Sequence, residues 1–313
     1  MARNEARFRE AEQRLWASFG VTPTEQRVRL PRIGTTVRVQ ELGEGPAVLF
    51  VHGGSNGGSS WAPLAARLPG FRCLLLDRPG CGLSGAIPRR LADYDAMATF
   101  ADGLIVDFLD ALELETADVI STSFGGCFAL RAAAKHPRRI SRLLEFGYPI
   151  GAPASNVPMI MRMPWGRVMA RLSTLVPQNE RSVRMTLRQI GLAQALRSGN
   201  FTDIEVAWFL SLMRDTDTMR NEIAAGPSPF RLRGDLNPKM LLPDGLLGSI
   251  QCPVRFLWGE EDPFGGPESA RAFVGKVPGA ELELVPGAGH AVWMDDPDWA
   301  ARATQAFLSP VNC

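Results

Sequence analysis

Strand-like apolar runs alternate with helix-like segments along most of this 313-residue chain. The strand-like runs occur at residues 27–30, 36–42, 47–51, 71–77, 117–122, 140–146, 252–258 and 281–285. Helix-like segments accompany the later runs, at 93–112, 124–136, 266–277 and 297–308. Strands that alternate with helices form parallel β-α-β units. The pattern therefore predicts an α/β fold with a doubly wound, mostly parallel eight-stranded sheet, in which the early strands form an antiparallel edge.

The alternation stops between residues 150 and 248, where several helices are expected in succession. These helix-like segments lie at 157–175, 180–197, 203–213 and 215–224, and a Pro- and Gly-rich tail follows them. An all-helical insert between two sheet strands indicates a cap, or lid, over an active site. The insert holds eight of the 11 Met residues. Met is flexible and suits a surface that adapts to apolar ligands, although it serves equally well in ordinary helix packing.

The N-terminal segment carries apolar residues at helical spacing, namely Phe8, Leu15, Trp16 and Phe19. This spacing predicts an amphipathic helix over residues 4–19 that packs on the body of the protein. The expected organisation is an N-terminal helix within 1–26, a core made of 27–149 and 249–313, and a helical cap at 150–248. The oligomeric state stays open, because the cap and the N-terminal helix are both surfaces through which copies could form a homo-oligomer.

The charge balance and the cysteine content limit the binding partners and the cellular compartment that we expect for this protein. With 34 basic and 33 acidic residues the formal net charge is +1, which gives no general attraction for nucleic acid or an anionic membrane. The five Cys are scattered and odd in number, which favours a reducing compartment and gives no metal-ligand spacing. The N-terminus lacks the apolar stretch of a signal peptide, and no apolar run is long enough to span a membrane. We therefore expect a cytoplasmic protein that acts on a small molecule.

Ser123 stands between the strand-like run ADVIST and the helix-like run GCFALRAAAKH. A tight strand-to-helix turn holds a hydroxyl at the carboxyl edge of a sheet, usually within the pattern G-x-S-x-G. Here Gly125 is kept, and Ser121 replaces the first glycine at some steric cost. Ser121 is itself a poor candidate nucleophile because it lies within the strand run. Ser123 is therefore the expected nucleophile.

A serine hydroxyl needs a neighbouring imidazole to take its proton and to return it to the leaving group. The chain has three His. His52 directly precedes a glycine pair, and His136 ends a helix-like segment. His290 follows the last strand-like run in a Gly-flanked loop, which can project a side chain over the sheet edge. We therefore expect His290 to be the base.

An acidic residue should follow a strand end and orient that base. Asp262 does so, and it would fix the imidazole tautomer and stabilise the imidazolium. Glu260 and Glu261 are less favoured neighbours. Asp295 and Asp296 follow the histidine, and we expect them to cap the final helix.

The loop VHGGSNGGSSW supplies glycines that let the backbone approach a substrate closely. An oxyanion needs preset N–H donors, and these are often the largest single contribution to acyl transfer. We expect one from Phe124, directly after the nucleophile, and one from Gly54, with Ser55 as the runner-up. The absence of a G-K-[ST] motif, and of a G-x-G-x-x-G motif that opens a helix, argues against a phosphate site.

Five segments together resemble the α/β-hydrolase superfamily: LFVHGG, LLLDRPGCGLS, STSFGG, FLWGEEDPF and VPGAGHAVWMDDP. They occur in the family's order between residues 47 and 308, with the insert where the family carries its cap. The resemblance implies an α/β-hydrolase fold, a triad of Ser123, Asp262 and His290, and no metal or cofactor. It also implies a structural role for Asp77 and Arg78.

The residues also separate branches of this family. Dehalogenases and epoxide hydrolases of this fold use Asp as the nucleophile, unlike Ser123. Carbon–carbon bond hydrolases tend to have Asn before the nucleophile and Trp after the histidine, where this chain has Thr122 and Ala291. We therefore expect a serine esterase for small to medium apolar substrates, with Trp61, Trp293 and Ser55 in the pocket.

Three alternatives stay open. One is a carbon–carbon bond hydrolase of diketo-acids, and the others are a cofactor-free perhydrolase and a catalytically silent ligand-binding homologue. Arginines of the insert would bind the diketo-acid carboxylate, unless they form a solvated helix face; they are Arg162, Arg167, Arg171, Arg184 and Arg188.

Overall fold

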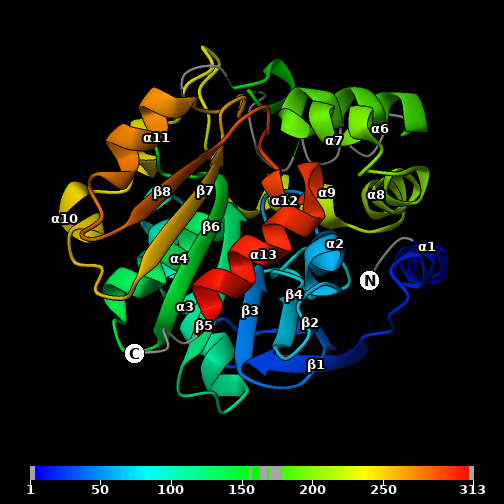
Figure 1. Cartoon of the computed structure of the whole chain (residues 1–313), viewed down its shortest axis with the longest axis horizontal. Helices are drawn as coiled ribbons and strands as arrows, with labels where there is room; N and C mark the ends of the chain where they lie inside the picture. Colours follow the sequence, from blue (N-terminus) through cyan, green and yellow to red (C-terminus); the bar gives the residue numbers. More distant parts are fainter. Residues whose placement is uncertain (1–3, 155–156, 163–167, 169–171, 173–177, 310–313) are drawn as a thin grey trace.

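A single sheet organises the computed structural model, which describes residues 4–154, 157–162, 168, 172 and 178–309 (Figure 1). The strand order is β1-β2-β4-β3-β5-β6-β7-β8. The strands are β1 Thr24–Leu30, β2 Thr35–Leu42, β3 Ala47–Val51, β4 Arg72–Leu76, β5 Ala117–Ser123, β6 Ile140–Pro149, β7 Val254–Gly259 and β8 Glu281–Val285. β2 pairs antiparallel with β1 and β4, and every other pairing is parallel. The expected α/β sheet with an antiparallel edge is confirmed.

Helices cover both faces of the sheet, because successive side chains of a buried strand point to opposite sides. Along β3, Leu49 and Val51 pack with one set of helices, whereas Val48 and Phe50 pack with the other. The first set is α3 Tyr94–Ala111, α4 Phe124–Lys135 and α11 Pro267–Val274. The second set is α1 Glu5–Ser18, α2 Ala62–Ala65, α12 Val292–Asp295 and α13 Pro297–Leu308. In Figure 1, α13 lies across the near face of the sheet.

The segment between β6 and β7 is helical and is called the insert from here on. Its helices are α6 Glu180–Leu187, a π-helical turn Arg188–Leu192, α7 Ala193–Ser198, α8 Asp203–Asp215, α9 Thr218–Ala225 and α10 Asp244–Leu247. Two 3₁₀ turns, Met159–Met161 and Pro238–Met240, complete the described part. Figure 1 shows α6, α7 and α8 grouped beyond one end of the sheet. The helix expected at 157–175 lies mostly outside the described residues.

The single helix expected at 180–197 is wrong in one respect: it is interrupted at Gly191, whose φ is 95°. The reason is a close approach to the loop that carries His290. The Gly191 carbonyl accepts a hydrogen bond from the His290 N–H at 3.1 Å, and a Cβ on residue 191 would lie 2.6 Å from the His290 Cβ. Glycine alone fits this position without strain.

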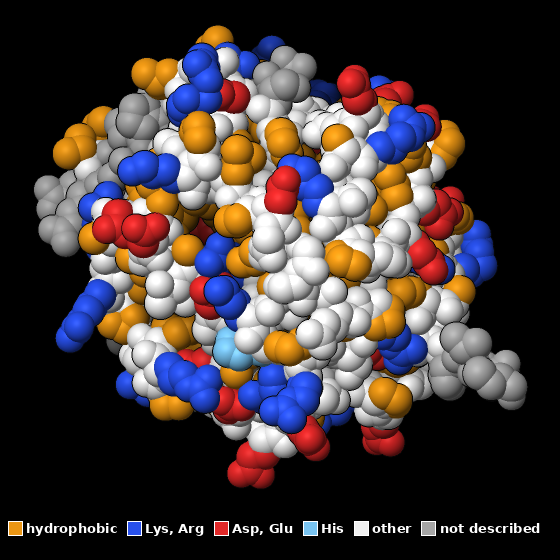
Figure 2. Space-filling model, turned by 90° about the vertical axis from the view of Figure 1, so that its left-hand side faces the viewer, with side chains coloured by type: hydrophobic (Ala, Val, Ile, Leu, Met, Phe, Trp, Pro, Cys, Tyr) orange, Lys and Arg blue, Asp and Glu red, His pale blue; other side chains and the backbone are white. Residues whose placement is uncertain are grey.

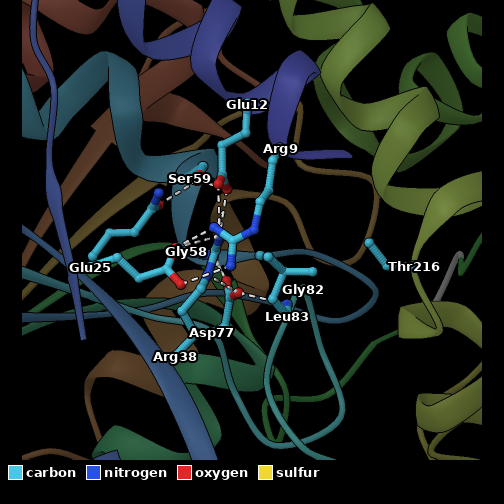
Figure 3. Close-up of polar contacts among 12 residues, drawn as sticks. Arg9, Glu12, Glu25, Arg38, Gly58, Ser59, Asp77, Gly82, Leu83 and Thr216 are labelled. Atoms are coloured by element: carbon cyan, nitrogen blue, oxygen red, sulfur yellow. Dashed lines mark hydrogen bonds and ion pairs between the residues drawn. The ribbon is translucent and has the colours of Figure 1, made fainter. Parts of the chain in front are cut away.

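Helix α1 buries Phe8, Leu15 and Trp16, whereas Phe19 is only half-buried. Its buried Glu12 forms two hydrogen bonds with Arg38 of β2, at 2.6 and 2.7 Å. Arg38 also bonds Asp77 at 2.8 Å, and Asp77 accepts from the Gly58 N–H at 2.7 Å (Figure 3). Buried charges are tolerated when they are paired in this way. The network ties α1 to the loop after β3.

Charged side chains of both signs are interspersed on the face seen in Figure 2, in keeping with the net charge of +1. Among the described residues, no helix combines the length and the apolar character needed to cross a membrane.

Candidate active site

Ser123 ends β5 at the point where α4 begins, in a sharply strained turn. Its φ of 56° and ψ of −118° place a non-glycine residue in the left-handed half of backbone space. A Cβ on residue 125 would lie 2.0 Å from the Val51 carbonyl oxygen, so Gly125 is required for the turn to pack on β3. Strain of this kind is typical of functional positions, and it projects the Ser123 hydroxyl beyond the strand end.

Ser121 forms a hydrogen bond that the sequence analysis did not predict. Its hydroxyl donates to Glu145, a fully buried residue of β6 that lies opposite it in the strand pairing. The same carboxyl receives a hydrogen bond from the Ser123 backbone. Burial raises the pKa of Glu145 well above its ordinary value, which favours the neutral form of this carboxyl. Glu145 therefore supports the strained turn from behind, and Ser121 contributes a bond that glycine would lack.

His290 and Asp262 lie side by side at the same edge of the sheet. The His290 Nδ1 is 2.8 Å from an Asp262 carboxylate oxygen. Asp262 is buried and accepts two further hydrogen bonds, from the Tyr148 N–H at 2.9 Å and the Phe264 N–H at 3.0 Å. The carboxylate is therefore fixed, and it holds the imidazole with Nε2 directed away from Asp262. Glu261, the less favoured alternative, is exposed.

Ser123 and His290 both line one cavity of about 80 Å³. The insert contributes apolar side chains to it, namely Met161, Leu187, Ile190, Leu192, Phe201, Trp208 and Phe209. The core contributes Gly53, Gly54, Asn56, Thr122, Phe124, Phe264, Ala291, Trp293 and Met294. Among the described residues, His290 is the one lining side chain able to carry a charge.

Comparison with known proteins identifies the family of this chain. Residues 46–297 match the family model described as the alpha/beta hydrolase fold. The chain belongs to this family. It is 24% identical over 280 residues to 2-hydroxy-6-oxo-6-phenylhexa-2,4-dienoate hydrolase of Burkholderia cepacia, covering 87% of this chain and 91% of the relative. It is 28% identical over 280 residues to 2-hydroxy-6-oxononadienedioate/2-hydroxy-6-oxononatrienedioate hydrolase of Paraburkholderia xenovorans (strain LB400), covering 86% and 89%.

Among solved structures, carboxylesterase CesB from Bacillus subtilis superposes with a TM-score of 0.73. The match covers 97% of this chain and 98% of the esterase at 19% identity, a likeness of fold. The protein is therefore an α/β-fold hydrolase whose relatives include dienoate and dienedioate hydrolases.

Of the three residues expected in the pocket of the hydrolase, one lines the cavity and two do not. Trp293 lines the cavity, as expected. Trp61 does not: it is fully buried behind Trp293, with the two rings stacked at a centroid separation of 4.2 Å. Ser55 also lies outside the lining, because its hydroxyl turns to Glu222 of α9 at 3.0 Å.

The loop that we expect to bind the oxyanion, called the oxyanion-binding loop from here on, follows β3. Gly54 lines the cavity and packs on Phe124, since a Cβ on residue 54 would lie 3.0 Å from the Phe124 ring. The Ser55 N–H, the runner-up donor, bonds instead to Glu222. Gly54 and Phe124 thus stay the candidate donors, and Phe124 opens α4, where a helix N-terminus favours negative charge.

His52 has a structural place beneath this loop. It is fully buried, its Nε2 accepts from the Arg78 N–H at 3.1 Å, and its Nδ1 donates to the Gly53 carbonyl at 2.7 Å. Burial, together with the nearby Arg78 guanidinium, lowers the pKa of His52 well below its ordinary value. His52 is therefore a neutral brace for the turn between β3 and the loop.

The expected pair of helix caps is half right. Asp296 caps α13 by accepting from the Trp299 N–H at 2.9 Å. Asp295 is no cap: it is buried and accepts from the Gly289 N–H at 2.8 Å, next to His290. Burial raises the pKa of Asp295 to about 6. The residue braces the loop that carries the candidate base.

Proposed function

We propose that this hydrolase cleaves neutral carboxylic esters of small to medium apolar substrates through an acyl-enzyme on Ser123. The observation that carries the proposal is the apolar cavity shared by Ser123 and His290. The 2.8 Å contact between His290 and Asp262 supports the assignment of base and orienting acid. We also propose that the insert acts as the cap of this cavity, because its side chains form much of the lining.

In the proposed reaction, Ser123 Oγ attacks the ester carbonyl carbon while His290 Nε2 takes the hydroxyl proton. Asp262 accepts from Nδ1–H and stabilises the imidazolium. The N–H groups of Gly54 and Phe124 bind the oxyanion. When the tetrahedral intermediate collapses, the alkoxide leaves with the proton from His290. Water, deprotonated by His290, then releases the acid, so the route needs no metal or cofactor.

The apolar lining of the cavity favours a neutral ester over a negatively charged diketo-acid as the substrate. A substrate carboxylate buried in this cavity would need a cation, because an unpaired buried charge is costly. Of the insert arginines, Arg184 is paired with Asp203, Arg162 donates to the Val157 carbonyl at 2.7 Å, and Arg188 is exposed. Arg167 and Arg171 lie outside the described residues.

The second candidate is a carbon–carbon bond hydrolase using the same three side chains. The names of the curated relatives favour it, since they are dienoate and dienedioate hydrolases. Both candidates require Ser123, His290 and Asp262, and they differ in whether the substrate carries a carboxylate.

The test is a hydrolysis panel with Ser123→Ala as the blank. We expect p-nitrophenyl acetate and butyrate to be cleaved with a higher kcat/KM than a 2-hydroxy-6-oxo-dienoate. Turnover of the dienoate with little turnover of the esters would instead support the carbon–carbon hydrolase. Failure of a fluorophosphonate to label Ser123 in folded protein would support a silent homologue.

A further inference from the structure

We propose that Glu222, on α9 of the insert, is a positioning residue that holds the oxyanion-binding loop in its working shape. The inference rests on the proposed ester hydrolysis by Ser123 and adds a residue to it. It means that one half of the oxyanion site depends on the insert, which lies more than 160 positions further along the chain than the loop it holds.

The contacts of Glu222 divide between its two carboxylate oxygens. Oε2 accepts from the backbone N–H of Ser55 and from the Ser55 hydroxyl, the latter at 3.0 Å. Oε1 accepts from Arg78 at 2.5 Å and lies 3.6 Å from the Cys81 sulfur. Glu222 is 9% exposed and Arg78 is 5% exposed, so this ion pair is shielded from water. The carboxylate therefore joins the loop after β3 to the turn after β4.

Arg78 extends the same network to both candidate oxyanion donors. Its guanidinium donates to the Gly53 carbonyl at 2.7 Å, directly before Gly54. It also lies over the Phe124 ring, 5.9 Å from the ring centroid. The positive charge of Arg78 offsets the negative charge of Glu222, which would otherwise oppose an oxyanion nearby. The pair thus fixes the loop without leaving a net charge behind the site.

The backbone conformation of Ser55 explains why the loop needs a stabilising contact. Ser55 has a φ of 47°, a left-handed conformation that a non-glycine residue seldom adopts without support. Glu222 accepts the N–H of this strained residue, and a Cβ on residue 54 would lie 3.5 Å from its Oε2. Glu222 is not among the residues that line the cavity, so it acts through Ser55 and Gly54. Without this acceptor, the Gly54 N–H would lose its fixed direction toward the oxyanion.

The experiment compares Glu222→Gln and Glu222→Asp with the wild type on p-nitrophenyl butyrate. The inhibition constant of a trifluoromethyl ketone, which forms a tetrahedral oxyanion adduct with a reactive serine, is measured alongside. Arg220→Ala is the matched control, because Arg220 lies on the same helix and pairs at the surface with Asp217 at 2.9 Å.

We expect Glu222→Gln to lower kcat by about 10- to 100-fold, since removing one oxyanion donor outright costs about 100- to 1,000-fold. The inhibition constant should rise by a similar factor, while KM stays within about threefold of wild type. Glu222→Asp, which keeps the charge but shortens the reach, should lie between, and Arg220→Ala should match wild type. If Glu222→Gln cannot be obtained folded, Glu222→Asp decides the test.

The outcomes separate the two proposals. If the wild type does not cleave the ester through Ser123, the proposed function and this inference both fail. If the wild type does so and the Glu222 variants keep wild-type kcat and inhibition constant, this inference alone is overturned. A rise in KM without a fall in kcat would also overturn it, because that result would reflect substrate binding by the insert and not support of the oxyanion.

Discussion

Ser123 and Ser55 both have a positive φ angle but are held by different parts of the molecule. Their φ angles are 56° and 47°. Each has a buried glutamate as the acceptor of its backbone hydrogen bond, Glu145 for Ser123 and Glu222 for Ser55. Glu145 lies on β6, the strand next to the one that carries Ser123, whereas Glu222 comes from the insert.

The two glutamates also differ in charge. Burial raises the pKa of Glu145 and so favours its neutral form. Glu222 is ion-paired with Arg78. We infer that the sheet itself fixes the nucleophile, whereas the oxyanion-binding loop takes its shape from the insert. A substitution in the insert should therefore alter the conformation of the loop more readily than that of Ser123.

The same substitution at both serines gives the largest contrast. Ser123→Ala removes the proposed nucleophile and should lower kcat by about 10⁵-fold or more. Ser55→Ala keeps the backbone N–H that bonds Glu222, so kcat should stay within about threefold of wild type. Ester hydrolysis measures both, with circular dichroism to show that each variant is folded. Comparable losses at the two positions would break the distinction between a reacting and a supporting serine.

Asp262→Asn should give the next largest loss, about 10⁴-fold in kcat, because an amide stabilises the wrong imidazole tautomer. Its control is Glu261→Gln, an exposed neighbour that should leave kcat unchanged. Hydrolysis rates over a range of pH measure the effect. A large loss in the Glu261 variant with little in the Asp262 variant would move the orienting acid to the neighbouring position.

Matched Glu→Gln substitutions test whether charge distinguishes the two glutamates. Glu145→Gln introduces a neutral amide of similar shape where burial already favours the neutral acid, so kcat should stay within about threefold of wild type. Glu222→Gln breaks an ion pair and should cost about 10- to 100-fold. The same ester assay ranks the two variants. An equal loss in both would mean that charge does not distinguish the two glutamates.

Asp295, which braces the loop of His290, gives the smallest effect and one confined to stability. Its pKa rises from 3.8 to about 6, so the folded state keeps a proton that the unfolded chain releases. The resulting cost is absent below about pH 4, grows as the pH rises to about 6 and then stays constant, at no more than about 3 kcal/mol. Asp295→Asn removes this cost.

The Tm of Asp295→Asn relative to wild type should therefore increase between pH 4 and pH 7, as thermal unfolding at both pH values would measure. A Tm difference that is the same at both pH values would show that Asp295 does not titrate differently in the folded protein.

The sequence predicted the parts of the molecule whose signals are local. Strand and helix alternation located all eight strands, and the strand-turn-helix pattern placed Ser123 at a tight turn between a strand and a helix. Asp262 and His290 follow strand ends, and parallel strands bring such ends to one edge, where the two side chains meet. Elimination among three histidines left His290 as the candidate base, because His52 and His136 had other local explanations.

What the sequence did not reveal depends on contacts between distant segments. Glu145 sits in an apolar run that is typical of a core strand, and its role follows only from the pairing register that sets it against Ser121. Glu222 has no local signal, because its partner Arg78 is 144 positions away. The break at Gly191 likewise depends on the His290 loop, which no helical periodicity anticipates.

The most direct measurement is the mass of the protein after its reaction with p-nitrophenyl acetate is quenched with acid. The account predicts one acetyl group per chain, located by peptide mapping on Ser123 and absent from Ser123→Ala. An acetyl group on another residue, or full turnover by Ser123→Ala, would contradict it.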